Sequence, residues 1–142
     1  MTFMVTYRVE GPPQGKGRPR FRSTGKFVQT YTPAKTKAYE DEIRDAARQA
    51  MGVSEPLEGP IKAYIMMAMP MPKSMSKADR EKAILGNLKP IKKPDADNCA
   101  KAFLDAMNGI VYKDDAQIVR LQVGKVYGEY PCVEVIVMED LE

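Results

Sequence analysis

Residues 93–119 of the chain read KPDADNCAKAFLDAMNGIVYKDDAQIV, a short helical pattern with an acidic pair before it and another after it. We expect Asp97 to be the N-cap of a helix that ends at Gly109, since Asp favours the position before a helix and Gly the position after it. Asp97, Lys101 and Asp105 recur at every fourth position and therefore form one polar stripe. This stripe is the candidate working face of the helix.

The segment after this helix decides whether the two acidic pairs meet. A strand at Ile110–Tyr112 would run back antiparallel to the helix. Because a strand rises ~3.3 Å per residue and a helix ~1.5 Å, a few extended residues retrace most of the helix. Asp114 or Asp115 would then return to the helix start, where Asp95 and Asp97 lie.

Carboxylates that converge in one pocket repel one another unless a cation neutralises them. Ligation by oxygen alone suits Mg²⁺ or Mn²⁺ better than zinc. A bound ion would lower the pKa of a water molecule and so supply a hydroxide that attacks a phosphate. Lys101 would contact that phosphate or stabilise its developing charge. The alternative is structural: Asp97 only caps the helix, Asp114 and Asp115 belong to a turn, and Lys101 pairs with Asp97 or Asp105.

The composition narrows the chemistry further. The chain has no histidine, which excludes catalytic triads and His-ligated metals and leaves carboxylates, Lys, Arg and Tyr. Its two cysteines, Cys99 and Cys132, are too few for a disulfide framework or a four-sulfur zinc site, so we expect both to be small buried residues.

Positive charge is concentrated in two stretches, although the formal net charge is only +3. Residues 15–27 read GKGRPRFRSTGKF and contain no acid, and residues 73–93 are also mainly basic. From Asp95 onward acids outnumber bases. This asymmetry predicts basic segments that contact a polyanion beside an acidic centre; solvated surface charge is the alternative. The candidate DNA-binding residues are Lys16, Arg18, Arg20, Arg22, Lys92 and Lys93.

The remaining sequence predicts a single α/β (α+β) domain over residues 1–142, with a mixed sheet and two to three helices. A Gly- and Pro-rich loop at residues 11–20 should cross the surface with its cationic side chains outward. Thr32 should cap a helix that lasts until Gly52, and Ser76 should cap a shorter one. Strands are expected at residues 4–9, 61–69, 118–127 and 132–138, the last two paired with each other, with a hairpin within residues 21–31.

No stretch approaches the roughly 20 apolar residues that a membrane span needs, and the N-terminus lacks the pattern of a signal peptide. We therefore expect a cytoplasmic protein.

The run at residues 93–119 resembles the signature of the RusA family of Holliday-junction resolvases, endonucleases of bacteria and their phages. The early GKGRPRF and the closing CVEVIVME also fit. The resemblance implies that Asp95, Asp97 and Asp115 bind a catalytic Mg²⁺, for which Mn²⁺ would substitute, and that Lys101 is the essential basic residue. The role of the neighbouring Asp114 is left open.

The resemblance further implies a homodimer that makes paired cuts across a four-way DNA junction during recombination and repair, with no nucleotide cofactor. A prophage origin would be in keeping with it. One alternative is an inactive DNA-binding or phage accessory protein on the same scaffold. Another is a phosphotransferase with an aspartate nucleophile, which the charged approach IKKP disfavours because such enzymes place DxD after an apolar strand.

Overall fold

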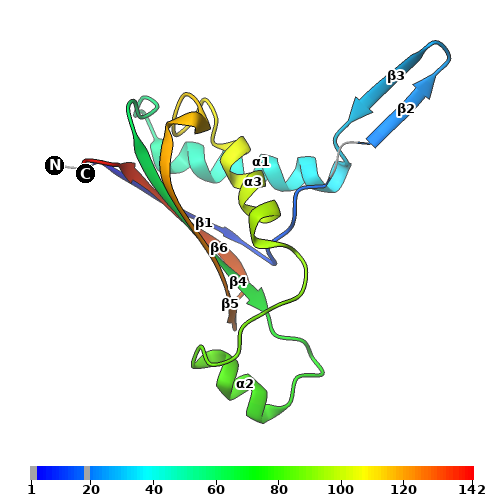
Figure 1. The fold of residues 1–142 in the computed structure, drawn as a ribbon, viewed down its shortest axis with the longest axis vertical. Helices are drawn as coiled ribbons and strands as arrows, with labels where there is room; N and C mark the ends of the chain where they lie inside the picture. Colours follow the sequence, from blue (N-terminus) through cyan, green and yellow to red (C-terminus); the bar gives the residue numbers. More distant parts are fainter. Residues whose placement is uncertain (1–2, 18–19) are drawn as a thin grey trace.

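The computed structural model describes residues 3–17 and 20–142, which form a mixed sheet with helices packed on it (Figure 1). The strand order is β1-β6-β4-β5. Strand β6 is antiparallel to both of its neighbours, whereas β5 runs parallel to β4. The predicted fold class, a single α+β domain with a mixed sheet, is confirmed. The strands are β1 (Met4–Glu10), β4 (Ile61–Pro70), β5 (Ile118–Gly128) and β6 (Cys132–Glu139).

The predicted pairing of the last two strands is wrong, because β4 lies between β5 and β6. Strand β4 alternates buried and less buried residues, with Ile61, Ile65 and Met67 at most 1% exposed. Such an apolar strand is most stable at the centre of a sheet, where both of its edges are hydrogen-bonded. The short connection after Gly128 therefore joins two strands that are not neighbours.

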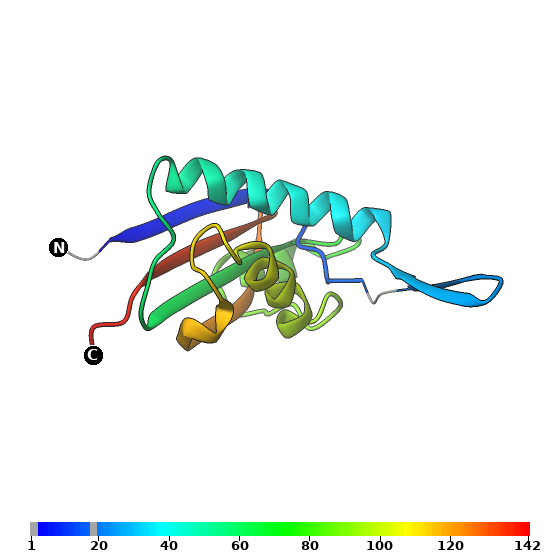
Figure 2. The same cartoon turned by 90° about the horizontal axis from the view of Figure 1, so that it is seen from above.

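Helices α1 (Ala34–Met51) and α3 (Ala96–Ala106) cover the same face of the sheet (Figure 2). Phe103 of α3 is fully buried and packs on the rings of Tyr39 and Tyr7. The opposite face, which carries Tyr64 and Met66, has neither helix over it. The sheet therefore has one covered and one uncovered side.

The helix caps agree only in part with the sequence. Ser76 caps α2 (Lys77–Ile84) as predicted, and its hydroxyl accepts a hydrogen bond from the Asp79 N–H at 3.1 Å. Thr32 was expected to cap α1, but the N-cap is Pro33. Helix α1 ends at Met51 and its C-cap is Gly52, whose φ of 58° is in the left-handed region that glycine favours.

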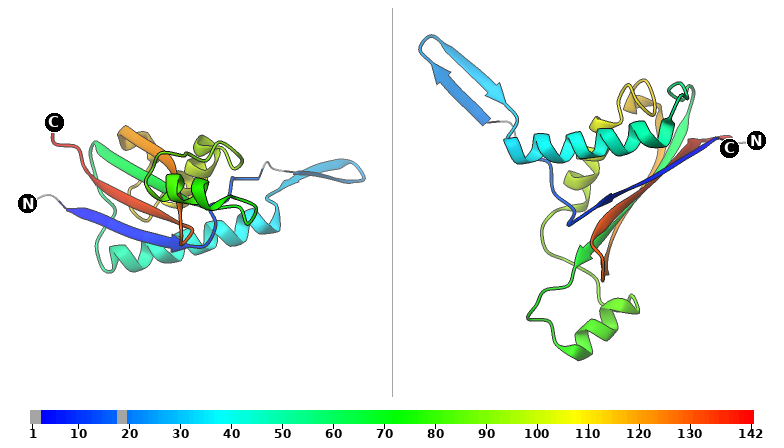
Figure 3. Two further views of the ribbon diagram at one scale, coloured as in Figure 1. Left: turned by 90° about the horizontal axis from the view of Figure 1, so that it is seen from below. Right: turned by 180° about the vertical axis from the view of Figure 1, so that it is seen from behind.

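A separate two-stranded sheet, β2 (Arg20–Thr24) and β3 (Phe27–Tyr31), confirms the predicted hairpin. Gly25, with φ of 70°, lies in its turn. The hairpin projects away from the main sheet, beyond the N-terminal end of α1 (Figure 3).

Both cysteines are buried and free, as predicted. Burial raises the pKa of the Cys99 thiol to about 11, so this thiol is protonated at neutral pH. Among the helices of the described residues, none is long and apolar enough to cross a membrane.

Candidate active site

Helix α3 presents the polar stripe that the sequence predicts. Cys99 and Phe103 turn into the core, whereas Asp97 and Lys101 are exposed and Asp105 is half-buried. The N-cap, however, is Asp95, so the prediction of Asp97 at that position is wrong. Asp97 lies instead in the first turn of the helix.

The segment after α3 is not the predicted strand at Ile110–Tyr112. Val111 and Tyr112 are fully buried, and the Tyr112 hydroxyl donates to the Leu104 carbonyl at 2.6 Å. The Leu57 N–H donates to the Val111 carbonyl at 2.8 Å. Residues 110–112 therefore form turns that are hydrogen-bonded to α3 and to Leu57, and not an extended strand. The reason is that the side chains of Val111 and Tyr112 are both buried in the core.

A 3₁₀ turn, η1 (Asp115–Gln117), nevertheless brings Asp115 back to α3. Asp114 caps this turn, and Gln117 completes a capping box by accepting from the Asp114 N–H at 3.0 Å. The Asn108 side chain accepts from the Asp115 N–H at 2.9 Å, which ties the turn to the end of the helix. The capping network holds the Asp115 backbone in place.

Asp97, Lys101, Asp105 and Asp115 line one cavity of about 350 Å³. The structure thus brings together three of the four predicted catalytic residues. Apolar side chains from α3 and β5 complete the walls, namely Ala96, Ala100, Leu104, Leu121 and Val123. The two β5 residues were not identified from the sequence, because alternation alone does not say which cavity a strand faces.

The cavity perturbs the carboxylate of Asp115. Partial burial raises its pKa, and the neighbouring Asp114 and Asp105 raise it further, while a hydrogen bond with Asn108 opposes them. Each of these causes except the last disfavours the charged form. A cation beside Asp115 would relieve this repulsion, so the donor chemistry fits the predicted all-oxygen site for Mg²⁺.

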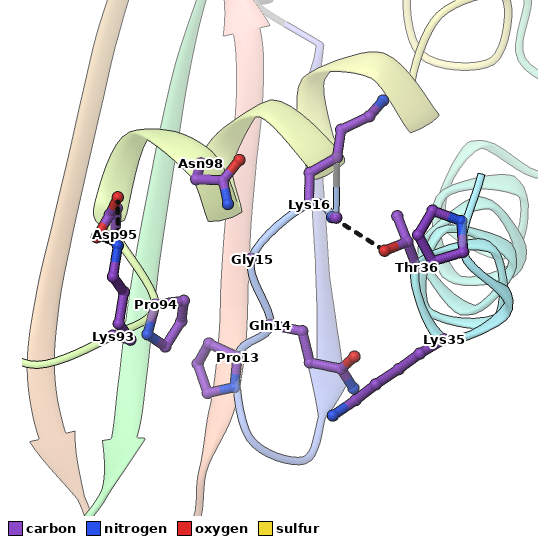
Figure 4. Close-up of a pocket in the computed structure, with 12 residues that line it drawn as sticks. Pro13, Gln14, Gly15, Lys16, Lys35, Thr36, Lys93, Pro94, Asp95 and Asn98 are labelled. Carbon is purple, nitrogen blue, oxygen red and sulfur yellow. Dashed lines mark hydrogen bonds and ion pairs between the residues drawn. The ribbon is translucent and has the colours of Figure 1, made fainter. Parts of the chain in front are cut away.

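Asp95 is not among the residues that line this cavity. Its carboxylate pairs with the Lys93 ammonium at 3.1 Å and lines a second, larger cleft of about 700 Å³ (Figure 4). Across residues 3–17 and 20–142, no three acidic, His or Cys side chains are grouped closely enough to hold a metal ion. Metal binding by Asp95, Asp97 and Asp115 together stays a prediction.

Three segments build the larger cleft: the loop at residues 13–17, the start of α1 and the start of α3. Lys35 and Lys93 both line it, from opposite sides. The Lys125 ammonium donates to the carbonyls of Lys92 and Pro94, at 2.7 and 3.1 Å, and so holds the connection between α2 and α3 against β5.

Lys16 points inward, so the prediction that this cation faces outward is wrong. Its ammonium lies 2.6 Å from Asp105 Oδ2 and 3.2 Å from Glu40 Oε1. Burial lowers its pKa, but the hydrogen bonds to Asp105 and Glu40 outweigh that effect and the net pKa is raised. Lys101 lies 3.5 Å from the same Asp105 oxygen. One carboxylate thus joins the basic loop to the candidate catalytic lysine.

The glycines on either side of Lys16 permit this close approach. A Cβ on Gly17 would lie 2.5 Å from the Thr36 hydroxyl, and one on Gly15 would lie 2.7 Å from the Asn98 side chain. The Gly17 N–H donates to Thr36 at 2.9 Å. The run GKG is therefore a packing motif between α1 and α3 as well as part of a basic stretch.

Of the other predicted DNA contacts, Arg22, Lys92 and Lys93 are exposed. Arg18 lies outside the described residues, and Arg20 opens strand β2.

The family model described as Endodeoxyribonuclease RusA matches residues 10–138. The chain therefore belongs to the RusA family of endodeoxyribonucleases, as residues 93–119 predicted. It is also similar to the uncharacterized protein YqaN of Bacillus subtilis strain 168. The two are 39% identical over 137 residues, which cover 95% of this chain and 96% of that protein.

Proposed function

We propose that the whole chain, residues 1–142, is one Mg²⁺-dependent endonuclease domain that resolves four-way DNA junctions by paired phosphodiester hydrolysis. It would act in the cytoplasm, in recombination and repair, and no nucleotide cofactor is needed. The observation that carries the proposal is the shared cavity of Asp97, Lys101 and Asp115 in a chain of the RusA family.

Asp95, Asp97 and Asp115 would hold Mg²⁺, with Mn²⁺ as a substitute; when bound, the ion supplies positive charge to the phosphate and acidifies a water molecule. The Asp95–Lys93 pair is well exposed, with side chains 54% and 86% accessible, so it is weak and Asp95 exchanges partners at little cost. The Lys101 side chain is 64% exposed, so its ammonium would exchange Asp105, 3.5 Å away, for a phosphate at the cavity at little cost.

DNA would be held by the basic surface around the cavity. Lys92 and Lys93 precede α3, and Arg18, Arg20 and Arg22 precede or enter the hairpin. Because contacts to phosphate release counterions, binding should weaken steeply as salt rises.

A homodimer would supply the two cuts, since a two-fold dimer presents two identical sites to a two-fold substrate. The uncovered face of the sheet supports this proposal. Met66 is 40% exposed there, and Tyr64 and Ile136 are only half-buried within the single chain. Apolar side chains on an open sheet face are the usual material of a subunit interface.

The test is cleavage of a synthetic four-way junction by Asp97→Asn and Asp115→Asn, with Asp45→Asn on the exposed side of α1 as the matched control. We expect each site variant to lose at least about a hundredfold in cleavage rate, as expected for a lost catalytic group, with junction binding retained. The control should cleave normally, and chelation of Mg²⁺ should stop all cleavage.

Binding without metal-dependent cleavage by the unaltered protein would instead favour an inactive DNA-binding protein. Full activity in either site variant would refute the assignment of the cavity.

A further inference from the structure

The β2–β3 hairpin exposes apolar side chains that no part of the main sheet covers. All five residues of β3 are exposed, and Phe21 of β2 is 72% exposed. A two-stranded hairpin alone is marginally stable in water, and exposed apolar surface adds to the cost. The hairpin projects away from the main sheet (Figure 1). It therefore has the character of a segment that acts in contact with a partner.

The strand register divides the hairpin into two unlike faces. Phe21 pairs with Thr30 and Ser23 with Val28, so Phe21 and Val28 share one face, and Val28 is 67% exposed. Arg22 lies on the other face, with its guanidinium 5.1 Å from the centre of the Tyr31 ring. Both faces therefore carry exposed aromatic side chains, Phe21 on one and Phe27 and Tyr31 on the other, and the second face also carries the Arg22 cation.

The positive charge of the hairpin and its flanking residues indicates which class of partner it contacts. Residues 11–39 contain seven Lys and Arg residues and no Asp or Glu. A second copy of the same hairpin would bring like charges together, whereas a polyanion complements them. Among polyanions, nucleic acid also offers flat apolar surfaces, which suit Phe21.

The exposed phenyl ring of Phe21 indicates which part of the DNA the hairpin contacts. Contact with phosphates requires only Lys or Arg, so a phenyl ring gains nothing from the backbone of a duplex. Within a continuous duplex the faces of the bases are covered by their neighbours. At a branch point the stack is interrupted, and a base that stacks on an aromatic side chain gains ~1–3 kcal/mol.

The position of the hairpin agrees with this contact. The 700 Å³ cleft is lined by Gly17, Pro33 and Lys35 at the base of the hairpin and by Lys93 and Asp95 at the start of α3. A strand with its phosphate at the acidic cavity would continue along this basic cleft toward the hairpin.

We propose that the hairpin stacks Phe21 on bases exposed at the branch point of a DNA junction, while Arg22 holds an adjacent phosphate. This inference rests on the proposed function and extends it, because it makes the hairpin the source of the preference for branched over linear DNA.

The test uses a four-way junction with 2-aminopurine at the branch point and a linear duplex with the same label. Ca²⁺ replaces Mg²⁺, so that binding is measured without cleavage. Phe21→Leu keeps an apolar side chain in the hairpin but removes the ring, and Phe21→Tyr keeps the ring. Leu85→Ala, at a 74% exposed apolar position beyond α2, is the matched control.

We expect Phe21→Leu to weaken junction binding about tenfold, in line with one lost stacking contact, to abolish the change in 2-aminopurine fluorescence, and to leave duplex binding unchanged. Phe21→Tyr and the control should behave as the unaltered protein. An equal loss on both DNAs, no loss on either, or a shift in oligomeric state would overturn the proposal.

Cleavage with Mg²⁺ is measured separately on the unaltered protein. A fluorescence change without cleavage would count against the proposed function alone, and cleavage without the fluorescence change would count against the hairpin contact alone.

Discussion

Lys16 and Lys101 share a single oxygen of Asp105, which makes Lys16 a positioning residue for the candidate catalytic lysine. Glu40, only 8% exposed, holds the other side of the Lys16 ammonium. Loss of Lys16 would leave Asp105 free to bind Lys101 more tightly and so withdraw it from the substrate phosphate.

We therefore predict that Lys16→Met lowers kcat for junction cleavage by about tenfold, equivalent to ~1.4 kcal/mol, with little change in binding. Glu40 would keep only its pairing with Arg44, 3.3 Å from Glu40 Oε2, so the free energy of unfolding should also fall by about 1–3 kcal/mol. Lys16→Arg keeps the charge and should restore most of the activity. Chemical denaturation and single-turnover kinetics measure the two effects.

If Lys16 instead contacted DNA directly, Lys16→Met would weaken binding and reduce its salt dependence by about one ion. That result would contradict the positioning role.

Asp114 should set the pH range of the reaction through its effect on the pKa of the neighbouring Asp115. Its charge is one of the causes that raise the pKa of Asp115, after burial. Asp114→Asn removes this charge but keeps an oxygen that accepts from the Ala116 N–H. The pKa of Asp115 should fall, and the acid limb of kcat/KM against pH should move to lower pH. An unmoved limb, or a shift to higher pH, would show that Asp115 ionisation does not limit activity.

The residues of the α3 stripe could be predicted from the sequence, whereas the position of Lys16 could not. The stripe of Asp97, Lys101 and Asp105 follows from helical period alone, and the structure confirms it. The inward position of Lys16 could not be predicted, because its partners Glu40 and Asp105 are distant in the chain and only packing brings them together.

The GKG run, residues 15–17, follows β1 and packs against helices α1 and α3. Gly17→Ala would force a Cβ against the Thr36 hydroxyl, which is close to its own backbone and has little room to move. We predict a loss of about 1–3 kcal/mol in unfolding free energy, the usual cost of overpacking.

Thr36→Ala provides the matched test by urea denaturation. Alone it loses the hydrogen bond from the Gly17 N–H, but combined with Gly17→Ala it also removes the clash. The double variant should therefore be more stable than the sum of the two single losses implies. Strict additivity would contradict the proposed contact.

Among the secondary-structure elements, all four strands of the main sheet, the hairpin and the helices were predictable, because each carries its own period and turn residues. The order of the strands in the sheet was not predictable, since the central place of β4 depends on burial from both sides. The predicted strand at residues 110–112 failed for a related reason: Val111 and Tyr112 are apolar because they fill the core, and this composition does not distinguish a strand from a buried turn.

The uncovered sheet face gives the proposed dimer a direct test. We predict that Ile136→Lys or Met66→Lys converts a dimer to a monomer in analytical ultracentrifugation, because a charge buried in an apolar interface is costly. Val119→Lys, at a 59% exposed site near the start of β5, is the control. A monomeric variant should nick junctions without paired cuts, and an unchanged sedimentation coefficient would place the interface elsewhere.

The two buried thiols also make the protein suitable for site-specific labelling. Cys99 and Cys132 are the only cysteines in the chain, and burial raises the pKa of both, so neither presents a reactive thiolate to solvent. A single cysteine introduced at the exposed Ser23 would therefore take a maleimide dye selectively. Energy transfer from that dye to a labelled DNA arm would follow the hairpin's approach in real time, without first removing either native cysteine.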